Sequence, residues 1–457
     1  MSDTFLMGCG AGFSGDRVDA PQSVVAAIAA SGKPGAIMFE TLAERTLALG
    51  QLARLADPEK GYDPLLYAFL PPILPICLEH GIPIISNFGA ANPPAAARLI
   101  RRQAESLGFS GVKIAVVSGD DVRGRIDLSL LDLWEGDAGA ELRQDEVIAA
   151  NAYLGARCIS DALNAGAQIV VTGRVADPAL ALGPLVAHFG WDWHDWDRIA
   201  AGTLAGHLLE CGAQVTGGYF ADPGYKDVPQ PENIGFPIAE VSADGGIVMT
   251  KAPGTGGLVS TRTVKEQILY EIHDPSSYLT PDVILDVTGV EIKQVGSDRV
   301  RVTGAKGRAA PPSLKATVCF PGDWLGEGEI TYAGPNALAR ARLAGDTVTK
   351  RIHMRGLDVD IRLDMIGTQS VFDSDAFDLQ GSFAEPVSEV RLRVAVSGAK
   401  KELVEQSVQE VLALYCCGPA GGGGVRTRLQ NRIRTASYML PRNVVSPSFT
   451  FLDGKGS

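Results

Sequence analysis

Residues 169–185 read IVVTGRVADPALALGPL, and this stretch decides the fold class. A short run of β-branched residues leads into a polar loop, and Pro178 follows at a position where helices commonly begin. The same order of apolar run and polar or glycine-rich loop recurs in residues 5–17, 36–49, 82–97 and 114–121. This alternation predicts an α/β fold with a Rossmann-like, mostly parallel sheet and helices on both faces.

The sequence changes character after residue 222. Alternating runs such as residues 283–304 (VILDVTGVEIKQVGSDRVRVTG) are typical of antiparallel strands. We therefore predict two domains: an α/β domain at 1–222, whose strand-end loops form the site, and a smaller α+β domain at 223–457. The second domain is expected to contribute antiparallel strands to the cleft and to oligomer contacts.

The charge balance excludes two classes of partner. The chain has a net charge of −12, whereas binding to nucleic acid or to an anionic membrane surface needs a surplus of Lys and Arg. The apolar stretch at residues 65–78 is interrupted by prolines and cannot form a spanning helix. The start of the chain lacks the features of a signal peptide, and its seven cysteines include no C-x-x-C pair. We expect a cytoplasmic protein without a zinc site or a redox dithiol.

The loop after residues 169–172 supplies the first candidate site. Ligands of open α/β sheets bind beyond the carboxyl ends of the strands, where Arg174 and Asp177 are expected. An Arg can bind a carboxylate through two parallel hydrogen bonds, and an Asp three residues later can act as a base. On this reading Arg174→Ala weakens ligand binding and leaves folding intact. The alternative is an Arg–Asp pair that only caps the helix.

Residues 207–227 supply further candidates. Glu210 is a candidate general acid or base, and Lys226 a candidate partner for a substrate carboxylate. Cys211 is either a nucleophile or a small buried residue. His207 precedes Glu210 by three residues, but this pair lacks the further ligand that a metal needs, so no metal ligand is predicted. A divalent cation at Glu40, Asp120 or Asp177 stays open as an alternative.

Strand-end loops also supply the expected substrate-binding residues. Residues 8–17 (GCGAGFSGDR) are rich in glycine but lack the G-x-G-x-x-G and G-x-x-x-x-G-K-[ST] spacings, which argues against NAD or ATP. Glu40 and Glu44 are either an acid–base pair or part of a surface ion-pair cluster. The predicted substrate-binding residues are Gly12, Ser14, Asp16, Arg17, Asn87, Thr216 and Thr255.

Seven strings in a fixed order carry a resemblance to a known family: GAGFSGDR, LAERTLAL, GYDPLL, SNFGAANP, TGRVADPALALGPL, LLECGAQVTGGYFADP and APGTGGLVSTRTVKEQILYEIHDPSSYLTPDV. They span residues 10–283 and resemble the core of the acyclic terpene utilisation (AtuA) family. The resemblance implies a place in catabolism, including the breakdown of acyclic terpenes through CoA thioesters. Longer relatives carry an additional small C-terminal domain, which implies a separate small subunit here.

Together these expectations point to a lyase of the hydratase or dehydratase type. Its substrate would be a small branched or dicarboxylic acid or its CoA thioester, held by Arg174 and Lys226 while Asp177 or Glu210 moves the proton. No cofactor is predicted, and CoA would enter only as part of the substrate. We also expect a homo-oligomer. Two alternatives stay open: acyl or CoA transfer with Glu210 or Cys211 as nucleophile, and a non-catalytic ligand-binding subunit completed by a small partner.

Overall fold

The computed structural model describes residues 4–135, 143–368 and 387–452. The chain divides into two compact units, one formed by residues 1–319 with 435–457 and the other by residues 320–434. The boundary expected near residue 222 falls inside the first unit. The reason is that the strands following residue 222 join the sheet that the N-terminal strands begin.

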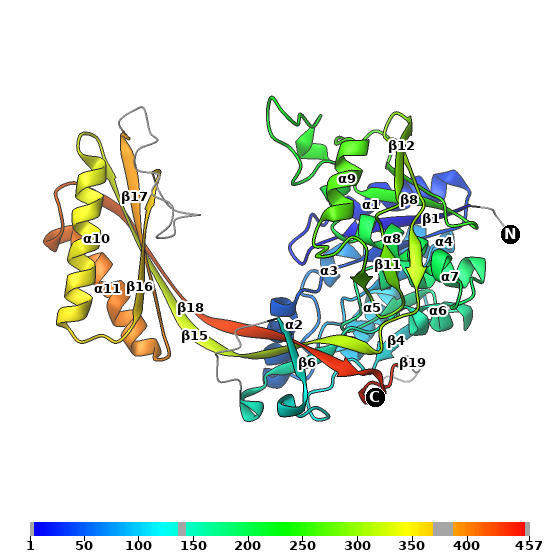
Figure 1. Cartoon of the computed structure of the whole chain (residues 1–457), viewed down its shortest axis with the longest axis horizontal. Helices are drawn as coiled ribbons and strands as arrows, with labels where there is room; N and C mark the ends of the chain where they lie inside the picture. Colours follow the sequence, from blue (N-terminus) through cyan, green and yellow to red (C-terminus); the bar gives the residue numbers. More distant parts are fainter. Residues whose placement is uncertain (1–3, 136–142, 369–386, 453–457) are drawn as a thin grey trace. The chain divides into compact units, whose positions relative to one another are not determined.

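A ten-stranded sheet forms the centre of the first unit (Figure 1). Its strands, in spatial order, are β12 (Glu291–Gly296), β13 (Arg299–Thr303), β9 (Ile247–Lys251), β8 (Pro237–Ser242), β1 (Thr4–Ala11), β2 (Gly35–Phe39), β3 (Ile84–Ser86), β7 (Ile169–Val171), β4 (Ile114–Ser118) and β19 (Ser448–Phe451). The strands expected from the five strand-and-loop patterns are confirmed as β1, β2, β3, β4 and β7.

The sheet is mixed rather than mostly parallel. The five central strands from β1 to β4 are parallel, and all residues of β2, β3 and β7 are buried, as expected for strands covered on both faces. Beyond β1, the strands β8, β9, β13 and β12 are antiparallel, and β19 pairs antiparallel with β4 at the other end. The α/β class is therefore confirmed, and a mostly parallel sheet is not.

Helices pack against the strands of this unit. They are α1 (Ala20–Ser31), α2 (Glu44–Ala56), α3 (Leu66–Phe69), α4 (Leu74–Glu79), α5 (Pro93–Ser106), α6 (Arg157–Asn164), α7 (Ala179–Phe189), α8 (Trp196–Glu210) and α9 (Thr261–Leu269). Pro178 directly precedes α7, as expected for a helix start, and Gly190 ends that helix in the left-handed conformation. At the start of α8, the side chain of Asp195 accepts a hydrogen bond from the backbone N–H of Arg198.

Two smaller groups of strands complete the first unit. One is a three-stranded antiparallel sheet of β10 (Tyr278–Leu279), β11 (Ile284–Asp286) and β14 (Lys306–Arg308). The other contains β5 (Asp132–Glu135), β6 (Ala149–Ala152), the beginning of β15 (Ser313–Ala333) and the end of β18 (Gly422–Pro441). In the part of the chain that the structure describes, no helix combines the length and the apolar character needed to cross a bilayer.

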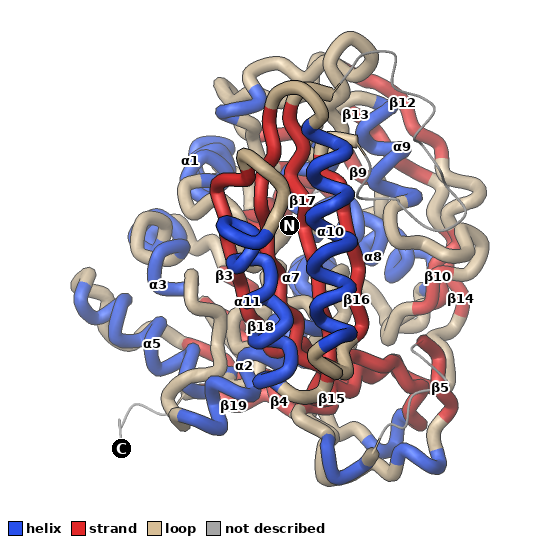
Figure 2. Tube along the Cα trace, turned by 90° about the vertical axis from the view of Figure 1, so that its left-hand side faces the viewer, coloured by secondary structure: helices blue, strands red, loops and turns tan. Residues whose placement is uncertain are grey.

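The second unit is a sheet with helices. Its strands are ordered β16 (Asp360–Ile366), β17 (Glu389–Gly398), β15 and β18, and its helices are α10 (Ala337–Met354) and α11 (Lys401–Cys417). Figure 2 shows the two helices side by side along this sheet. Their apolar core contains every second residue of β17, namely Val390, Leu392, Val394 and Val396. Between them, Arg391 and Arg393 form ion pairs with Glu329 and Glu327.

Candidate functional site

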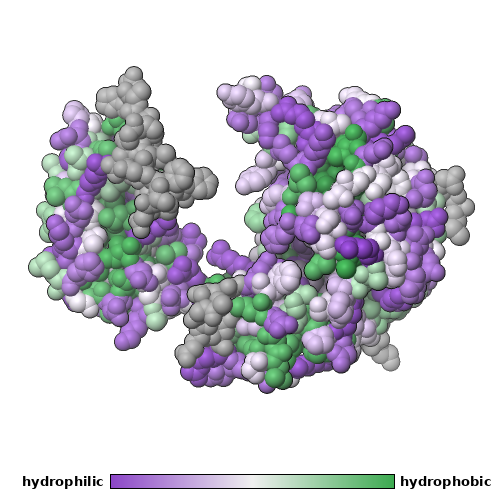
Figure 3. Space-filling view, viewed as in Figure 1, coloured by the Kyte–Doolittle hydropathy of each residue, from purple (hydrophilic) through white to green (hydrophobic). Residues whose placement is uncertain are grey.

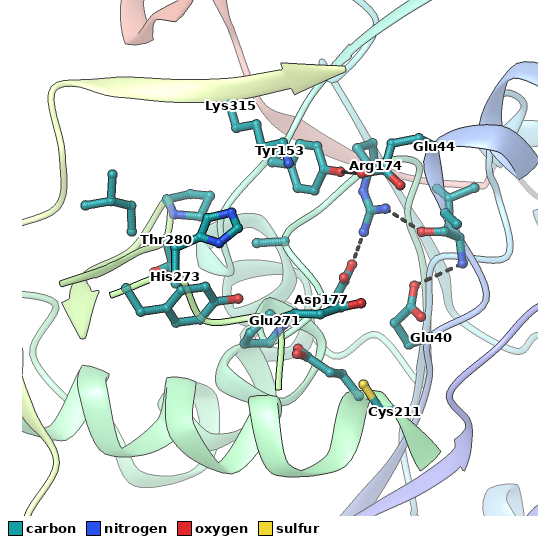
Figure 4. A pocket seen from close by; sticks show the side chains of 18 of the residues that line it. Glu40, Glu44, Tyr153, Arg174, Asp177, Cys211, Glu271, His273, Thr280 and Lys315 are labelled. Atoms are coloured by element: carbon teal, nitrogen blue, oxygen red, sulfur yellow. Dashed lines mark hydrogen bonds and ion pairs between the residues drawn. The ribbon is translucent and has the colours of Figure 1, made fainter. Parts of the chain in front are cut away.

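A cavity of about 940 Å³ lies within the first unit, and its lining includes loops that follow β1, β2 and β7 (Figure 4). The strands β1 and β2 are adjacent, and β3 separates β2 from β7. All are parallel, so their carboxyl ends meet at one edge of the sheet. The other walls come from the end of α8, from residues 270–281 and from residues 311–315.

Arg174 lies in the wall of this cavity and is 1% exposed. Its Nε and Nη2 donate to the carbonyl of Val175 at 2.8 and 2.6 Å, and Nη1 donates to the carbonyl of Leu42. Nη2 also pairs with Asp177, and the guanidinium lies over the ring of Tyr153 at 4.5 Å from its centroid. The guanidinium is thus engaged by protein groups and fixes the loop after β2 against the loop after β7.

The backbone of Arg174 is held from behind by Asp120. Asp120 Oδ2 accepts from the backbone N–H of Arg174 at 2.9 Å and from the side-chain amide of Asn151 at 2.8 Å. Asp120 is buried and does not line the cavity, and burial raises the pKa of its carboxyl. It therefore orients Arg174 rather than facing a ligand.

Glu40 and Asp177 place two carboxyl groups at the cavity wall, and Figure 4 shows both near Arg174. Burial and then the charge of Asp177 raise the pKa of Glu40 well above its ordinary value. Burial also raises the pKa of Asp177, although the charge of Arg174 opposes that shift. Because two neighbouring carboxyls do not both ionise easily, this pair retains a proton at a higher pH than isolated carboxyls would.

One hydrogen-bond network fixes Glu40. Its Oε1 accepts from the backbone N–H of Leu42 at 2.9 Å and from the side-chain amide of Asn87 at 2.8 Å. Asn87 also accepts from the backbone N–H of Thr41 and is fully buried. Asn87, expected to bind substrate, does not line the cavity and instead orients Glu40.

Glu44 behaves differently from Glu40. Burial by itself would raise its pKa, but a 2.6 Å hydrogen bond from the Tyr153 hydroxyl, together with the charges of Arg174 and Lys315, lowers it below the ordinary value. The cavity therefore holds an ionised carboxylate, Glu44, as well as the carboxyls of Glu40 and Asp177, whose pKa values are raised. Lys315 also lines the cavity, and its ammonium lies 3.1 Å from Glu135.

Glu210 lies at the end of α8 and lines the cavity, where burial raises its pKa to about 7. Its Oε1 lies 2.7 Å from Nδ1 of His207, one turn earlier on the same helix. The adjacent Cys211 also lines the cavity, and burial, followed by the charge of Glu210, raises its pKa above the ordinary value. A thiol that resists ionisation is a poor nucleophile, so the geometry does not favour Cys211 in that role.

Gly12 and Ser14 line the cavity, as expected for substrate-binding residues. A Cβ on Gly12 would lie 2.1 Å from the backbone nitrogen of Gly212 and 2.5 Å from the carbonyl oxygen of Glu210. Only glycine allows the loop after β1 to approach the end of α8 this closely. Asp16 supports the loop, because its Oδ2 accepts from the backbone N–H of Gly12 at 2.9 Å.

The remaining predicted residues lie outside the cavity lining. Arg17 donates to the carbonyl of Ile234 and pairs with Asp19. The hydroxyls of Thr216 and Thr255 donate to the carbonyls of Gly235 and Ala252. Lys226 forms an ion pair with Glu266 of α9 at 2.7 Å. The structure therefore brings Arg174, Asp177 and Glu210 together without Lys226.

The lining also includes polar residues that were not among the expected ones, such as Tyr153, Glu271, His273 and Lys315. Glu271 has a φ of 57°, a conformation that non-glycine residues rarely adopt and that concentrates at functional sites. Glu271 and His273 lie within the last of the seven strings that carry the family resemblance, but neither was singled out as a site residue. Lys315 lies outside those strings. Tyr153 directly follows β6 and belongs to no motif.

Within residues 4–135, 143–368 and 387–452, no group of three or more His, Cys, Asp or Glu side chains is arranged to hold a metal ion. What the arrangement can do chemically is donate and accept protons, because carboxyls with raised and lowered pKa values share one cavity.

Comparisons with known proteins give one informative match. The model of the family "Acyclic terpene utilisation family protein AtuA" matches residues 5–451. No curated protein matches the chain. Among solved structures, the "De novo designed protein Foldit4" is 14% identical, with 24% of this chain and 99% of that chain covered and a TM-score of 0.17, which is too low to inform on fold or function. Because the family match covers nearly the whole chain, this protein belongs to the acyclic terpene utilisation family AtuA.

Proposed function

We propose that this protein is a lyase of the hydratase or dehydratase type in the catabolism of acyclic terpenes or related branched compounds. Its substrate would be a small branched or dicarboxylic acid or its CoA thioester. The observation that carries the proposal is the pair of carboxyls of Glu40 and Asp177, which share one cavity and both have raised pKa values. The family match supports the catabolic setting.

A carboxyl pair that holds one proton can supply both the acid and the base of a hydration. In that direction the pair's proton goes to one carbon of a C=C bond, and a water oxygen bonds to the other carbon. The proton released by that water returns to the ionised member of the pair. The pair ends with one proton, as it began, so the reaction consumes water and alkene and needs no redox cofactor.

The fixed guanidinium of Arg174 supports this chemistry without binding the substrate. Its hydrogen bonds to Leu42, Val175 and Asp177 keep the two loops and the Asp177 carboxyl in place. A catalytic group that is held in advance loses no energy to reorganisation during the reaction. The role of Arg174 in this proposal is therefore positioning, and the anion must be bound elsewhere.

Lys315 is the lysine that the cavity offers for the substrate's negative end. Its side chain is 34% exposed, and its ammonium pairs with Glu135 and lies 5.6 Å from the centre of the Tyr153 ring. The same cavity is also lined by apolar side chains, which include Leu42, Leu279, Leu314 and Met439. A cavity with one lysine and several apolar side chains suits a branched acyl chain that carries one carboxylate or thioester.

The proposal predicts which of two lysines binds the substrate. In a thermal-shift screen, the purified chain is incubated with branched unsaturated acids, hydroxy acids, dicarboxylates and their CoA thioesters, because a ligand that binds only the folded state raises its Tm. We expect Lys315→Ala to remove the ligand-induced shift and Lys226→Ala to leave it unchanged. Both lysines pair with a glutamate at the surface, so Lys226 is a matched control. The opposite result would place anion binding at Lys226 and contradict the proposed site.

A further inference from the structure

His207 and Glu210 form a buried pair that the proposed mechanism does not use. His207 is 1% exposed and Glu210 is 6% exposed, and both lie on α8. Besides its 2.7 Å contact with Glu210, the His207 ring places Nε2 at 3.2 Å from the carbonyl oxygen of Ile268. The carbonyl of His207 itself accepts from the side-chain amide of Gln267, which ties the pair to α9.

The contact with Ile268 determines how protons are distributed in the pair. A carbonyl oxygen can only accept a hydrogen bond, so Nε2 must carry a hydrogen. Nδ1 then either accepts a hydrogen from a protonated Glu210 or donates one to an ionised Glu210. In both arrangements a single proton is shared between Nδ1 and Oε1, and the pair as a whole is neutral.

The surroundings favour this shared proton. The ring of Tyr278 lies 5.6 Å from that of His207, and Tyr278 remains a neutral phenol because burial raises its pKa. Asp177 and Glu271 act on Glu210 from other elements, and both raise its pKa, as burial does; Cys211 is the neighbouring thiol. Burial opposes a charge on His207, but the contact with Glu210 raises the pKa of the imidazole above its ordinary value.

The second carboxyl oxygen of Glu210, Oε2, indicates where a ligand would bind. Oε2 is buried and has no hydrogen-bond partner among the described residues, while Glu210 itself lines the cavity. An unpaired buried carboxyl oxygen costs stability, and such groups commonly reflect a partner that binds during function. A substrate or water at this wall of the cavity would supply that partner.

We infer that Glu210 is a second acid–base group of the cavity, exchanging the hydrogen on the substrate's carbon through Oε2, and that His207 is its positioning residue. This inference rests on the proposed function and refines it: Glu210 exchanges the proton on carbon, and the pair of Glu40 and Asp177 exchanges the proton on oxygen. In the dehydration direction, Glu210 accepts a proton from carbon, the C=C bond forms, and the C–O bond breaks as Asp177 protonates the leaving hydroxyl. Water in the cavity then returns the proton from Glu210 to Asp177, so only the substrate is consumed and one water molecule is released.

The pair can be tested without a substrate. The full chain is labelled with nitrogen-15 histidine, and the signal of His207 among the six histidines is identified by its absence in His207→Asn. We expect the His207 ring to titrate above its ordinary pKa in the wild type, and about one pH unit or more lower in Glu210→Gln. Glu266→Gln, at an exposed ion pair outside the cavity, serves as control and leaves the titration unchanged. The same titration in wild type and Glu210→Gln would overturn the pair.

The role in catalysis is tested by deuterium incorporation from heavy water into the carbon skeleton of a branched acid or thioester. We expect Glu210→Gln to lower the incorporation rate about 10²- to 10⁴-fold. His207→Asn keeps a hydrogen-bond donor near the position of Nδ1, so it should retain a higher incorporation rate than His207→Ala. It should lose the increase of the incorporation rate with pH.

Unchanged incorporation in Glu210→Gln, alongside loss of turnover in Asp177→Asn, would overturn this inference and leave the proposed function standing. If the wild type shows the coupled titration but adds no water to any compound, the proposed function fails and this inference fails with it.

Discussion

Arg174 lies at the edge of the sheet where its place in the sequence predicts it, and its guanidinium is engaged by protein groups. Its place on the loop after β7 was predicted, and it does lie at the cavity. Its guanidinium, however, is one of the largest fully buried groups of the chain and is bonded to Leu42, Val175 and Asp177. A side chain in that state holds loops together, whereas a ligand-binding arginine would keep donors directed at the cavity.

We therefore expect Arg174→Ala to destabilise the protein even without ligand. The change leaves two buried carbonyls and the carboxylate of Asp177, whose side chain is 36% exposed, without their donor. Each buried acceptor left unpaired costs about 1–3 kcal/mol. Urea unfolding of the free chain measures this loss. Arg198→Ala is the matched control, because Arg198 forms an ion pair with Asp195 at the same spacing but is 46% exposed; its effect should stay within about 0.5 kcal/mol. If both variants are equally stable, Arg174 is free to bind ligand after all.

The candidate site was predictable from the sequence only where it follows a strand. Arg174, Asp177, Gly12 and Ser14 were found because the carboxyl ends of parallel strands meet at one edge. Lys226 was predicted at the site because it lies in the same segment as Glu210, residues 207–227. Position in a segment does not show where a side chain points. The cavity's own lysine, Lys315, comes from the beginning of β15, and only tertiary pairing brings it to the strand ends.

At the scale of elements, alternation in the sequence identified strands but not their partners. Residues 283–304 were read as antiparallel strands, and β12 and β13 within this range do pair antiparallel. Alternation reports which side chains are buried, so it does not show that β13 joins β9 in the same sheet as β1. That missing information explains why the sheet was expected to be mostly parallel.

Helices α10 and α11 of the second unit are joined by Glu410. Glu410 of α11 is 5% exposed at its side chain and accepts from Arg351 of α10 at 2.5 Å and from Arg355, which directly follows α10, at 2.6 Å. Burial would raise its pKa, but the two arginines hold the pKa below the ordinary value. A carboxyl with a lowered folded-state pKa stabilises the fold above its unfolded pKa, and that stabilisation is lost as the pH falls through the folded value.

Glu410→Ala should therefore lower the free energy of unfolding by about 1–2 kcal/mol at neutral pH, because its two arginine partners remain partly hydrated. The difference from wild type should shrink as the pH falls from the ordinary pKa of a glutamate through the lower pKa of Glu410 in the folded state. Denaturation at several pH values measures both effects. Glu402→Ala, on the exposed first turn of the same helix, is the control. A difference that persists unchanged into acid would mean that packing rather than charge links the helices.

At the scale of the whole molecule, the chain leaves the first unit and returns to it. β15 leads out after Cys319, and β18 leads back at Thr435, after which β19 pairs with β4. A sequence read from one end to the other shows a change of pattern near residue 222 but not the later return. The surface in view is mostly hydrophilic on both units, with apolar residues gathered in smaller groups (Figure 3). All lining residues of the cavity belong to the first unit.

We propose that the carboxyls of this cavity add water to, or remove it from, a branched acyclic acid or thioester. The most direct measurement is turnover of such compounds in water labelled with oxygen-18, followed by mass spectrometry of the product. We predict one solvent oxygen in each hydrated product, and a rate that falls about 10²- to 10⁴-fold in Asp177→Asn but not in Glu410→Ala at temperatures where that variant is folded. A product without solvent oxygen, or a rate that Asp177→Asn leaves unchanged, would contradict the account.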